Sequence, residues 1–142
     1  MPFLGFDHID TRVRSIKSVE PFYDRLLPAL GLTEKRLAFV DANGEWHDAD
    51  AGRYNTVEYY EPPQAGRAAF FIGFIEDAAM QPVGTRIAFR IAAGELDRWL
   101  KDLKTIGGCK IELSEEPVDY PAIFFEDPSG TKLELVARKP RP

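Results

Sequence analysis

Three short stretches of the sequence each hold a side chain suited to chemistry: His8 in "DHID", Arg86 in "GTRIAF" and Glu134 in "TKLELV". An imidazole and a carboxylate can bind a divalent cation or move a proton. A guanidinium keeps its proton in a protein, so the charge of Arg86 must be hydrated or paired. The group that faces Arg86 therefore bears on what the protein can do.

Charged and apolar side chains alternate in the three predicted strands that contain these residues. Side chains alternate between the two faces of a strand, so one face collects the polar residues. Taken alone, such alternation is typical of the solvated outer face of an antiparallel sheet. The predicted polar face comprises His8, Asp10, Arg12, Arg86, Arg90, Lys132 and Glu134.

The predicted elements occur in the same order twice. Hydrophobic periodicity predicts helices over 18–31 and 95–108, each with an apolar stripe and a glycine at its end. Strands are predicted at 5–13, 33–44, 54–63 and 68–77, and again at 84–91, 109–118, 120–127 and 131–138. The order strand–helix–three strands repeats with a period near 78, because His8 aligns with Arg86. We therefore predict an α+β fold of two tandem βαβββ modules, about 5–77 and about 84–138, within a single domain over 1–142.

Composition argues against several classes of protein. The chain has 142 residues and a formal net charge of −5. It has no Lys/Arg-rich tract, so we expect no nucleic-acid partner. Cys109 is the only cysteine, which rules out an intrachain disulfide and a cysteine-based zinc cage. No signal peptide and no apolar stretch long enough to span a membrane are evident, so we expect a cytoplasmic protein without a membrane partner.

The sequence resembles the vicinal oxygen chelate superfamily, which includes glyoxalase I, bleomycin and fosfomycin resistance proteins, and extradiol dioxygenases. "FDHIDTRVRSIKSVEPFYDRLLPALGL" (6–32) is similar to the usual opening of such proteins. "TRIAFRI" and "FFEDPSGTKLELV" (124–136) are similar to strands of their second module. The resemblance implies that the modules form a curved mixed sheet around a cavity, which the polar face would line.

The resemblance also implies where a metal would bind. In metal-binding members the ligands come from the first and last strands of the two modules, and His8 and Glu134 match two of those positions. This sequence departs from the pattern twice. Arg86 stands where metal enzymes of the family often have histidine, and the strand 68–75 has no donor side chain.

A cation at a ligand position disfavours a metal ion. A unit charge and a divalent ion about 4 Å apart repel by roughly 8 kcal/mol at an effective dielectric constant of about 20. We therefore hypothesise that Arg86 pairs with Glu134 and replaces the metal. On this reading the protein needs no cofactor; the alternative is one divalent ion of Mn, Fe, Ni or Zn held by His8 and Glu134.

Further residues are candidates for ligand binding. The stretch "EWHDAD" (45–50) reads as a loop after a turn, from which His47 could reach a ligand at the cavity mouth. Tyr54 and Tyr60 belong to an aromatic set of which alternation sends about half to the core. On the predicted polar face Arg12, Arg86, Arg90 and Lys132 outnumber Asp10 and Glu134, so we expect the cavity to prefer an anionic or aromatic small molecule.

Three functions remain open from the sequence. The first is a metal-dependent lyase or dioxygenase of the glyoxalase-like class, with Glu134 or a neighbour moving a proton. The second is a metal-free binding protein of the bleomycin-resistance type. The third is metal-free catalysis, with Arg86 stabilising charge and His8 or Glu134 as acid or base. Many proteins that resemble this chain are homodimers, so we expect association.

Overall fold

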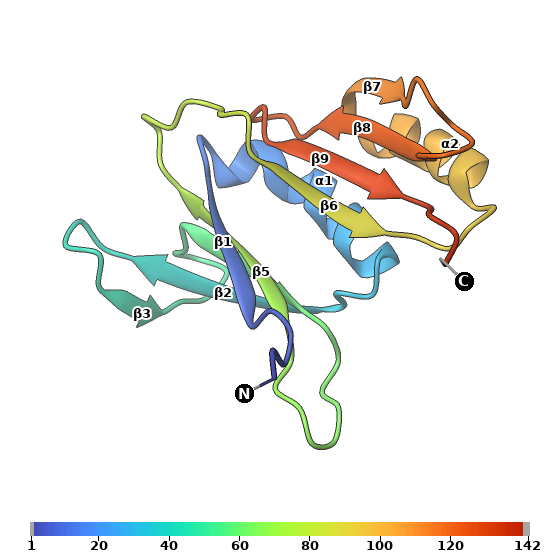
Figure 1. Ribbon diagram of the computed structural model, residues 1–142. Helices are drawn as coiled ribbons and strands as arrows, with labels where there is room; N and C mark the ends of the chain where they lie inside the picture. Colours follow the sequence, from blue (N-terminus) through green and yellow to red (C-terminus); the bar gives the residue numbers. More distant parts are fainter. Residues whose placement is uncertain (1, 141–142) are drawn as a thin grey trace. The chain divides into compact units, whose positions relative to one another are not determined.

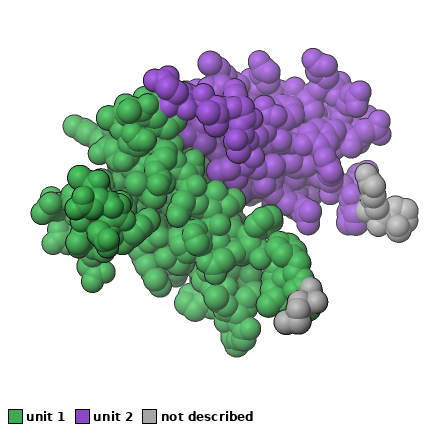
Figure 2. Space-filling view, turned by 60° about the vertical axis from the view of Figure 1, so that its left-hand side comes forward, with its two compact units in different colours: residues 1–80 green, residues 81–142 purple. Residues whose placement is uncertain are grey.

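The computed structural model describes residues 2–140, which fold as two compact units that divide after Met80 (Figures 1 and 2). The N-terminal unit contains β1 (His8–Val13), α1 (Ile16–Ala29), β2 (Glu34–Val40), β3 (Trp46–Asp48), β4 (Thr56–Tyr60) and β5 (Phe71–Glu76). The C-terminal unit contains β6 (Arg86–Arg90), α2 (Leu96–Ile106), β7 (Cys109–Leu113), β8 (Ala122–Glu126) and β9 (Lys132–Val136). Neither helix is long and apolar enough to cross a membrane.

The two units repeat one sheet topology. Strand order is β1-β5-β4-β2-β3 in the first sheet and β6-β9-β8-β7 in the second. The first strand of each unit pairs in parallel with its last strand, and the remaining neighbours are antiparallel. The predicted α+β fold of two βαβββ modules is thus confirmed. The strands form two sheets, one in each unit.

The core of the N-terminal unit lies between α1 and its sheet. The helix contacts β4 and β5, and its apolar stripe is buried there. Tyr23 stacks on Phe74 with 3.8 Å between ring centroids, and Tyr59 packs edge-on against Phe74. The Tyr59 hydroxyl donates to Asp24 Oδ1 at 2.8 Å, so its one polar group is satisfied at the edge of the core.

The core of the C-terminal unit has the same plan. Trp99 and Leu103 on α2 are buried, as are alternate residues of β8 and β9. Gly107 ends the helix in the left-handed conformation, as expected for a glycine after the last turn. The apolar faces of β8 and β9 comprise Ile123, Phe125, Leu133 and Leu135.

Two local predictions were wrong. Helix α1 begins at Ile16 because the Ser15 side chain caps it by accepting from the backbone N–H of Ser18, so the helix starts two residues earlier than predicted. The stretch 45–50 is not simply a loop, since Trp46–Asp48 pairs with β2 as the short edge strand β3.

Candidate functional site

The polar face of the C-terminal sheet is set by strand register. Arg86 is opposite Lys132, Ala88 is opposite Glu134, and Glu134 is opposite Phe124. Residues paired across adjacent strands point to the same side of a sheet. Arg86, Lys132, Glu134 and Phe124 therefore share one face, away from the buried residues that pack toward α2.

Glu134 is a buried carboxylate whose partner is a tyrosine. Glu134 is only 4% exposed, and its Oε1 accepts a hydrogen bond from the hydroxyl of Tyr120. This hydrogen bond is the largest cause of a raised pKa for Tyr120, and burial is the second. The guanidinium carbon of Arg138 lies 4.5 Å from the centroid of the Tyr120 ring. Tyr120 thus connects the buried carboxylate to a cation at the unit's surface.

The expected ion pair between Arg86 and Glu134 does not form in residues 2–140. The guanidinium carbon of Arg86 instead lies 4.7 Å from the centroid of the Phe124 ring, in a cation–π contact. Register explains the difference, because Arg86 is directly opposite Lys132 and only diagonal to Glu134. Tyr120, which sequence reasoning did not consider, takes the place of Arg86 as partner.

The basic side chains of this face are only partly neutralised. Lys132 Nζ lies 3.7 Å from Glu126 Oε2, and Lys110 Nζ lies 3.6 Å from Glu126 Oε1. Within the described residues, Arg86 and Arg90 have no carboxylate oxygen within 4.0 Å, and both are exposed. An open hollow of about 710 Å³, lined by Tyr120, Arg138 and residues of the 116–121 loop, lies at the other ends of β6 and β9 from Arg86 and Lys132.

The polar face of the N-terminal sheet holds a row of stacked rings. His8 stacks on Phe71 with centroids 4.6 Å apart, and Phe71 stacks on Tyr60 at 4.3 Å. The guanidinium carbon of Arg36 lies 4.2 Å from the Tyr60 ring centroid. Alternation along β1 places Asp10 and Arg12 on the same face as His8.

His8 has carboxylates on both sides of its ring. Its Nδ1 lies 2.7 Å from Asp7 Oδ2, and its Nε2 lies 3.6 Å from Asp10 Oδ2. The hydrogen bond to Asp7 is the main cause of a raised pKa for His8, with further contributions from the charges of Asp10 and Glu58. The carboxylates of Asp7 and Asp10 thus stabilise the protonated form of the imidazole relative to the neutral form.

Glu58 is a functional candidate that sequence reasoning missed. It is half-buried on β4. Burial is the largest cause of its raised pKa, and the charge of Asp10 is the second. Its position could have been inferred, because it alternates with the buried Val57 and Tyr59 and so points to the polar face. The residue of 68–75 that corresponds to Glu134 is Gly73, and Glu58 lies directly opposite Gly73 on the neighbouring strand.

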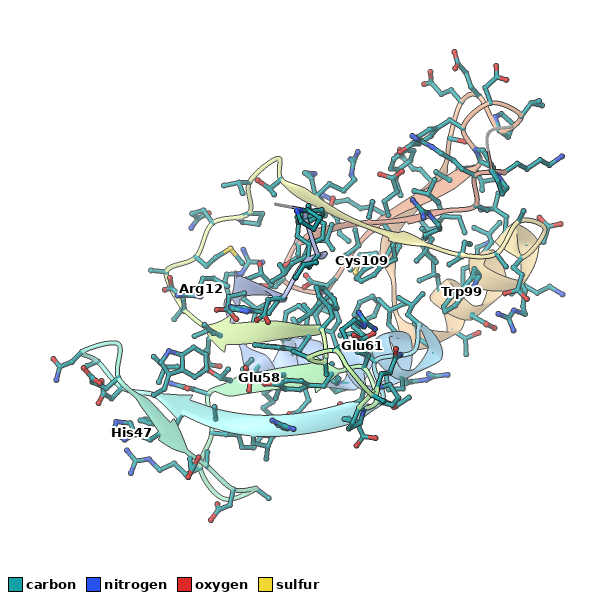
Figure 3. All side chains as sticks on the ribbon, turned by 60° about the horizontal axis from the view of Figure 1, so that its bottom comes forward. Arg12, His47, Glu58, Glu61, Trp99 and Cys109 are labelled. Atoms are coloured by element: carbon teal, nitrogen blue, oxygen red, sulfur yellow. The ribbon has the colours of Figure 1, made fainter. Side chains whose placement is uncertain are left out.

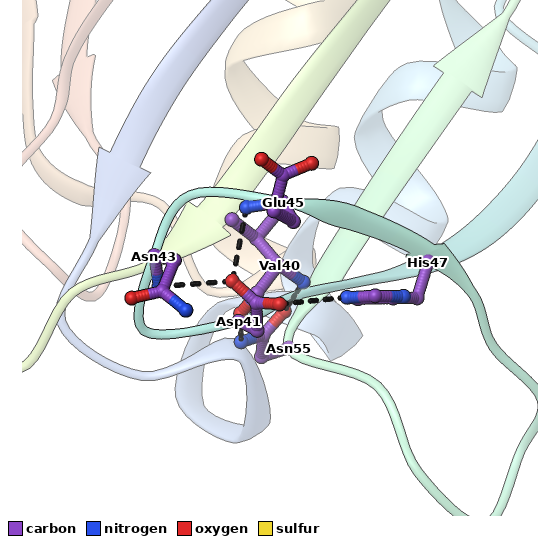
Figure 4. Close-up of polar contacts among 6 residues, drawn as sticks. All are labelled: Val40, Asp41, Asn43, Glu45, His47 and Asn55. Carbon is purple, nitrogen blue, oxygen red and sulfur yellow. Dashed lines mark hydrogen bonds and ion pairs between the residues drawn. The ribbon is translucent and has the colours of Figure 1, made fainter.

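Two predicted ligand-binding residues lie elsewhere. His47 is opposite Phe39, on the other side of β3 from Trp46, and its Nε2 lies 2.7 Å from Asp41 Oδ2 (Figures 3 and 4). That contact lowers the pKa of Asp41 and links β3 to the 41–45 turn. The Tyr54 hydroxyl donates to Glu20 Oε1 on α1 at 2.6 Å, so this side chain faces the helix and not the polar face.

The donor set fits a metal poorly within either unit. In residues 2–140 no three histidine, cysteine, aspartate or glutamate side chains are grouped so that they could hold an ion. Gly73 and Arg86 occupy two of the four positions that the family pattern assigns to ligands. One oxygen of Glu134, the remaining carboxylate, accepts from Tyr120.

Comparison with known proteins identifies the fold. No protein-family model matches the sequence, and no curated protein matches it. The fosfomycin resistance protein FosX from Mesorhizobium loti matches at 17% identity and a TM-score of 0.56, over 97% of this chain and 94% of that one. FosX from Listeria monocytogenes, in a monoclinic form at pH 5.75, matches at 18% identity and a TM-score of 0.62, over 97% and 94%.

A third structure comes from a different source. The integron cassette protein HFX_CASS4, from the mobile metagenome of the Halifax Harbour sewage outfall, matches at 17% identity and a TM-score of 0.58, over 96% of this chain and 100% of that one. These structures are of the vicinal oxygen chelate superfamily. Their likeness, together with the repeated βαβββ topology, shows that this chain has the vicinal oxygen chelate (glyoxalase/bleomycin resistance) fold, as its sequence resemblance predicted.

Proposed function

We propose that the protein binds a small anionic molecule on the polar face of the C-terminal sheet, with the guanidinium of Arg86 as its main contact. The observation behind this proposal is that Arg86 is exposed, has no carboxylate partner within the described residues, and stacks on Phe124. Stacking holds the guanidinium plane while its N–H donors remain free for an anion. Sulfate, phosphate or phosphonate oxygens match that arrangement of donors.

The surroundings of Arg86 support an anion over a cation. Arg90 and Lys132 share its face, and Lys110 reaches Glu126 on that face, so the basic side chains with Arg86 outnumber the carboxylates of Glu112, Glu126 and Glu134. Glu134 is engaged by Tyr120 and does not compete for Arg86. The rings of Phe124 and Tyr120 stack at 6.4 Å, which would suit an apolar or aromatic part of the ligand. His8, Asp10, Arg12 and Tyr60, the other expected ligand-binding residues, lie on the polar face of the N-terminal unit's own sheet and are not part of this anion site.

Two structural neighbours suggest which anions to test. One FosX structure from Listeria monocytogenes is a complex with Mn(II) and 1S,2S-dihydroxypropylphosphonic acid. Another is a complex with Mn(II) and sulfate. Both anions present several oxygens to a small site. Fosfomycin, phosphate and sulfate are therefore the first ligands to titrate here.

Calorimetric titration of the purified protein with these anions tests the proposal. We expect Arg86→Met to weaken binding about tenfold or more, because a charge-assisted hydrogen bond contributes about 1.5–3 kcal/mol. Arg98→Met is the matched control, since Arg98 is also an exposed arginine over a ring in the same unit, Trp99. Equal affinity in wild-type protein and Arg86→Met, or binding of propane-1,2-diol as tight as that of the anions, would refute an anion site at Arg86.

The second candidate function is a divalent-metal-dependent lyase or dioxygenase, which the Mn(II) in those neighbours favours. His8 and Glu134 are the residues that match ligand positions of the family pattern, and a bound ion would supply polarisation of a substrate oxygen. Metal analysis after incubation with Mn, Fe, Ni and Zn distinguishes the two. About one ion per chain that is lost in Glu134→Ala supports the enzyme; no bound ion supports metal-free binding.

A further inference from the structure

The N-terminal unit has a pocket of its own, and its lining carries negative charge where the Arg86 face carries positive charge. It has a volume of about 300 Å³ and is lined by His8, Asp10, Trp46, Glu58 and Phe71. These residues come from β1, β3, β4 and β5 of a single sheet. Strand alternation and register place all five on the polar face of that sheet.

Gly73 lies between the two carboxylates of this pocket and leaves room for both of them. Asp10 and Glu58 are opposite Gly73 on the strands at either side. A Cβ added to Gly73 would lie 2.8 Å from Asp10 Oδ1 and 3.6 Å from Glu58 Cγ. Both side chains therefore fold over the space that a larger residue would fill. The backbone of Gly73 is not left-handed, so its conformation does not require glycine. The lack of room for a Cβ beside Asp10 explains why a glycine is present.

Neither carboxylate has a strong cationic partner. The nearest basic nitrogen to Asp10 is His8 Nε2 at 3.6 Å, and Glu58 receives one long hydrogen bond, from the Tyr60 hydroxyl at 3.4 Å. No lysine or arginine nitrogen of the described residues lies within 4.0 Å of either. Arg36 is opposite Glu58 on β2, and its guanidinium is stacked over the Tyr60 ring. The raised pKa of Glu58 reflects the same burial and negative charge, which a bound cation would offset.

The walls of the pocket favour an organic cation over a bare metal ion. Trp46 is 48% exposed, so its indole is accessible to a ligand. Indole is the best cation–π partner among side chains, and an alkylammonium gains from both the ring and the carboxylates. A metal would need three or more grouped donors, which the described residues do not provide here.

We propose that this pocket binds an organic ammonium group, held by the carboxylates of Asp10 and Glu58 and by the ring of Trp46. The site is independent of the anion proposed at Arg86, because it uses other residues in the other unit and selects the opposite charge. An alkylammonium of the size of choline suits a pocket of this volume.

Tryptophan fluorescence gives a direct measurement with choline as the probe. The chain has two tryptophans, and Trp99 is buried at 4% exposure, so a surface ligand should act on the emission of Trp46. We expect saturable quenching by choline and none by 3,3-dimethylbutan-1-ol, its uncharged isostere. Quenching by both compounds with equal affinity would overturn the proposal, as would no response to choline.

Variants locate the site. Glu58→Gln should weaken choline binding about tenfold or more, because one charged contact is lost. Glu45→Gln is the matched control, since it removes the same charge next to Trp46 from a side chain that does not line the pocket. Circular dichroism checks that each variant is folded. Equal weakening by both variants would indicate general electrostatic attraction and overturn the assignment.

Two further arms separate this proposal from its alternatives. If Mn(II) binds and depends on Glu58 while choline does not bind, the pocket is a metal site and the ammonium site is refuted. Arg86→Met should leave choline binding unchanged, and Glu58→Gln should leave anion binding unchanged. Failure of one proposal therefore leaves the other standing.

Discussion

At the scale of residues, the strand or loop that lies beside a charged side chain sets its partner: Glu134 accepts from Tyr120, and Arg86 stacks on Phe124. Although the single polar face predicted from the sequence is divided between two sheets, alternation put Arg86 and Glu134 on one side of their sheet and His8 and Asp10 on one side of theirs, as the registers show. It could not show that Tyr120 would reach Glu134, because Tyr120 enters from the loop before β8 and has no strand register. It also left Glu58 unnoticed, although strand periodicity was enough to find it. Pairing depends on which neighbouring strand or loop is closest, and only the tertiary structure supplies that.

The contact between His8 and Asp7 gives a prediction about pH. The Asp7 carboxylate stabilises the protonated imidazole and raises the pKa of His8, so Asp7→Asn should lower that pKa toward its ordinary value. Proton NMR titration measures it directly. The chain has two histidines, so His47→Gln assigns the resonances. An unchanged His8 titration in Asp7→Asn would contradict the prediction.

The same contact has a consequence for stability. A histidine whose folded pKa is raised stabilises the fold below its unfolded pKa, and that contribution disappears as pH rises through the folded pKa. Asp7→Asn should therefore lower the free energy of unfolding more at about pH 5 than at about pH 8. The effect will be small, because the His8 side chain is 42% exposed and solvent screens the pair. Urea unfolding at both pH values tests it, with Asp48→Asn as a surface control.

At the scale of elements, periodic signals were reliable and boundaries were not. Both helices and the predicted strands are present, because each has an apolar stripe or alternation that the core requires. The predicted start of α1 was too late because Ser15 and Ser18 are both acceptable N-caps, and Ser15 is the one that caps the helix. The edge strand β3 was missed because three exposed residues leave almost no hydrophobic signal.

The turn between β8 and β9 gives a prediction at this scale. Gly130 has a φ of +89°, and a Cβ there would lie 2.8 Å from Cγ of Pro82. Gly44 has a similar φ of +82° with no atom within 4 Å. Gly44→Ala should cost about 1 kcal/mol of unfolding free energy from backbone strain alone, whereas Gly130→Ala should cost about 2–3 kcal/mol because Pro82 must also move. Urea denaturation compares them, and equal losses would show that the ring of Pro82 yields freely.

At the scale of the whole molecule, the repeat was the most informative feature of the sequence. The period near 78 predicted two modules of one topology, and the matching strand orders confirm it. Function was less accessible, because one fold supports several chemistries and depends on a few positions. In this chain Arg86 and Gly73 stand where the family pattern has metal ligands, and Glu134 accepts a hydrogen bond from Tyr120.

The N-terminal stretch gives the last prediction, which concerns association. Phe3, Leu4 and Phe6 are 78%, 89% and 74% exposed, and Phe3 contacts Phe6 edge-on. Adjacent exposed apolar side chains are typical of an interaction surface, and most soluble oligomers are closed dimers of identical chains. Light scattering should therefore give twice the 16.0 kDa chain mass. Phe3→Ser combined with Phe6→Ser should shift the protein toward the monomer, whereas Val118→Ser, which removes another exposed apolar side chain, should not. A monomeric mass for the wild-type protein at all concentrations would contradict the expected homodimer, and an unshifted double variant would show that the dimer forms through another surface.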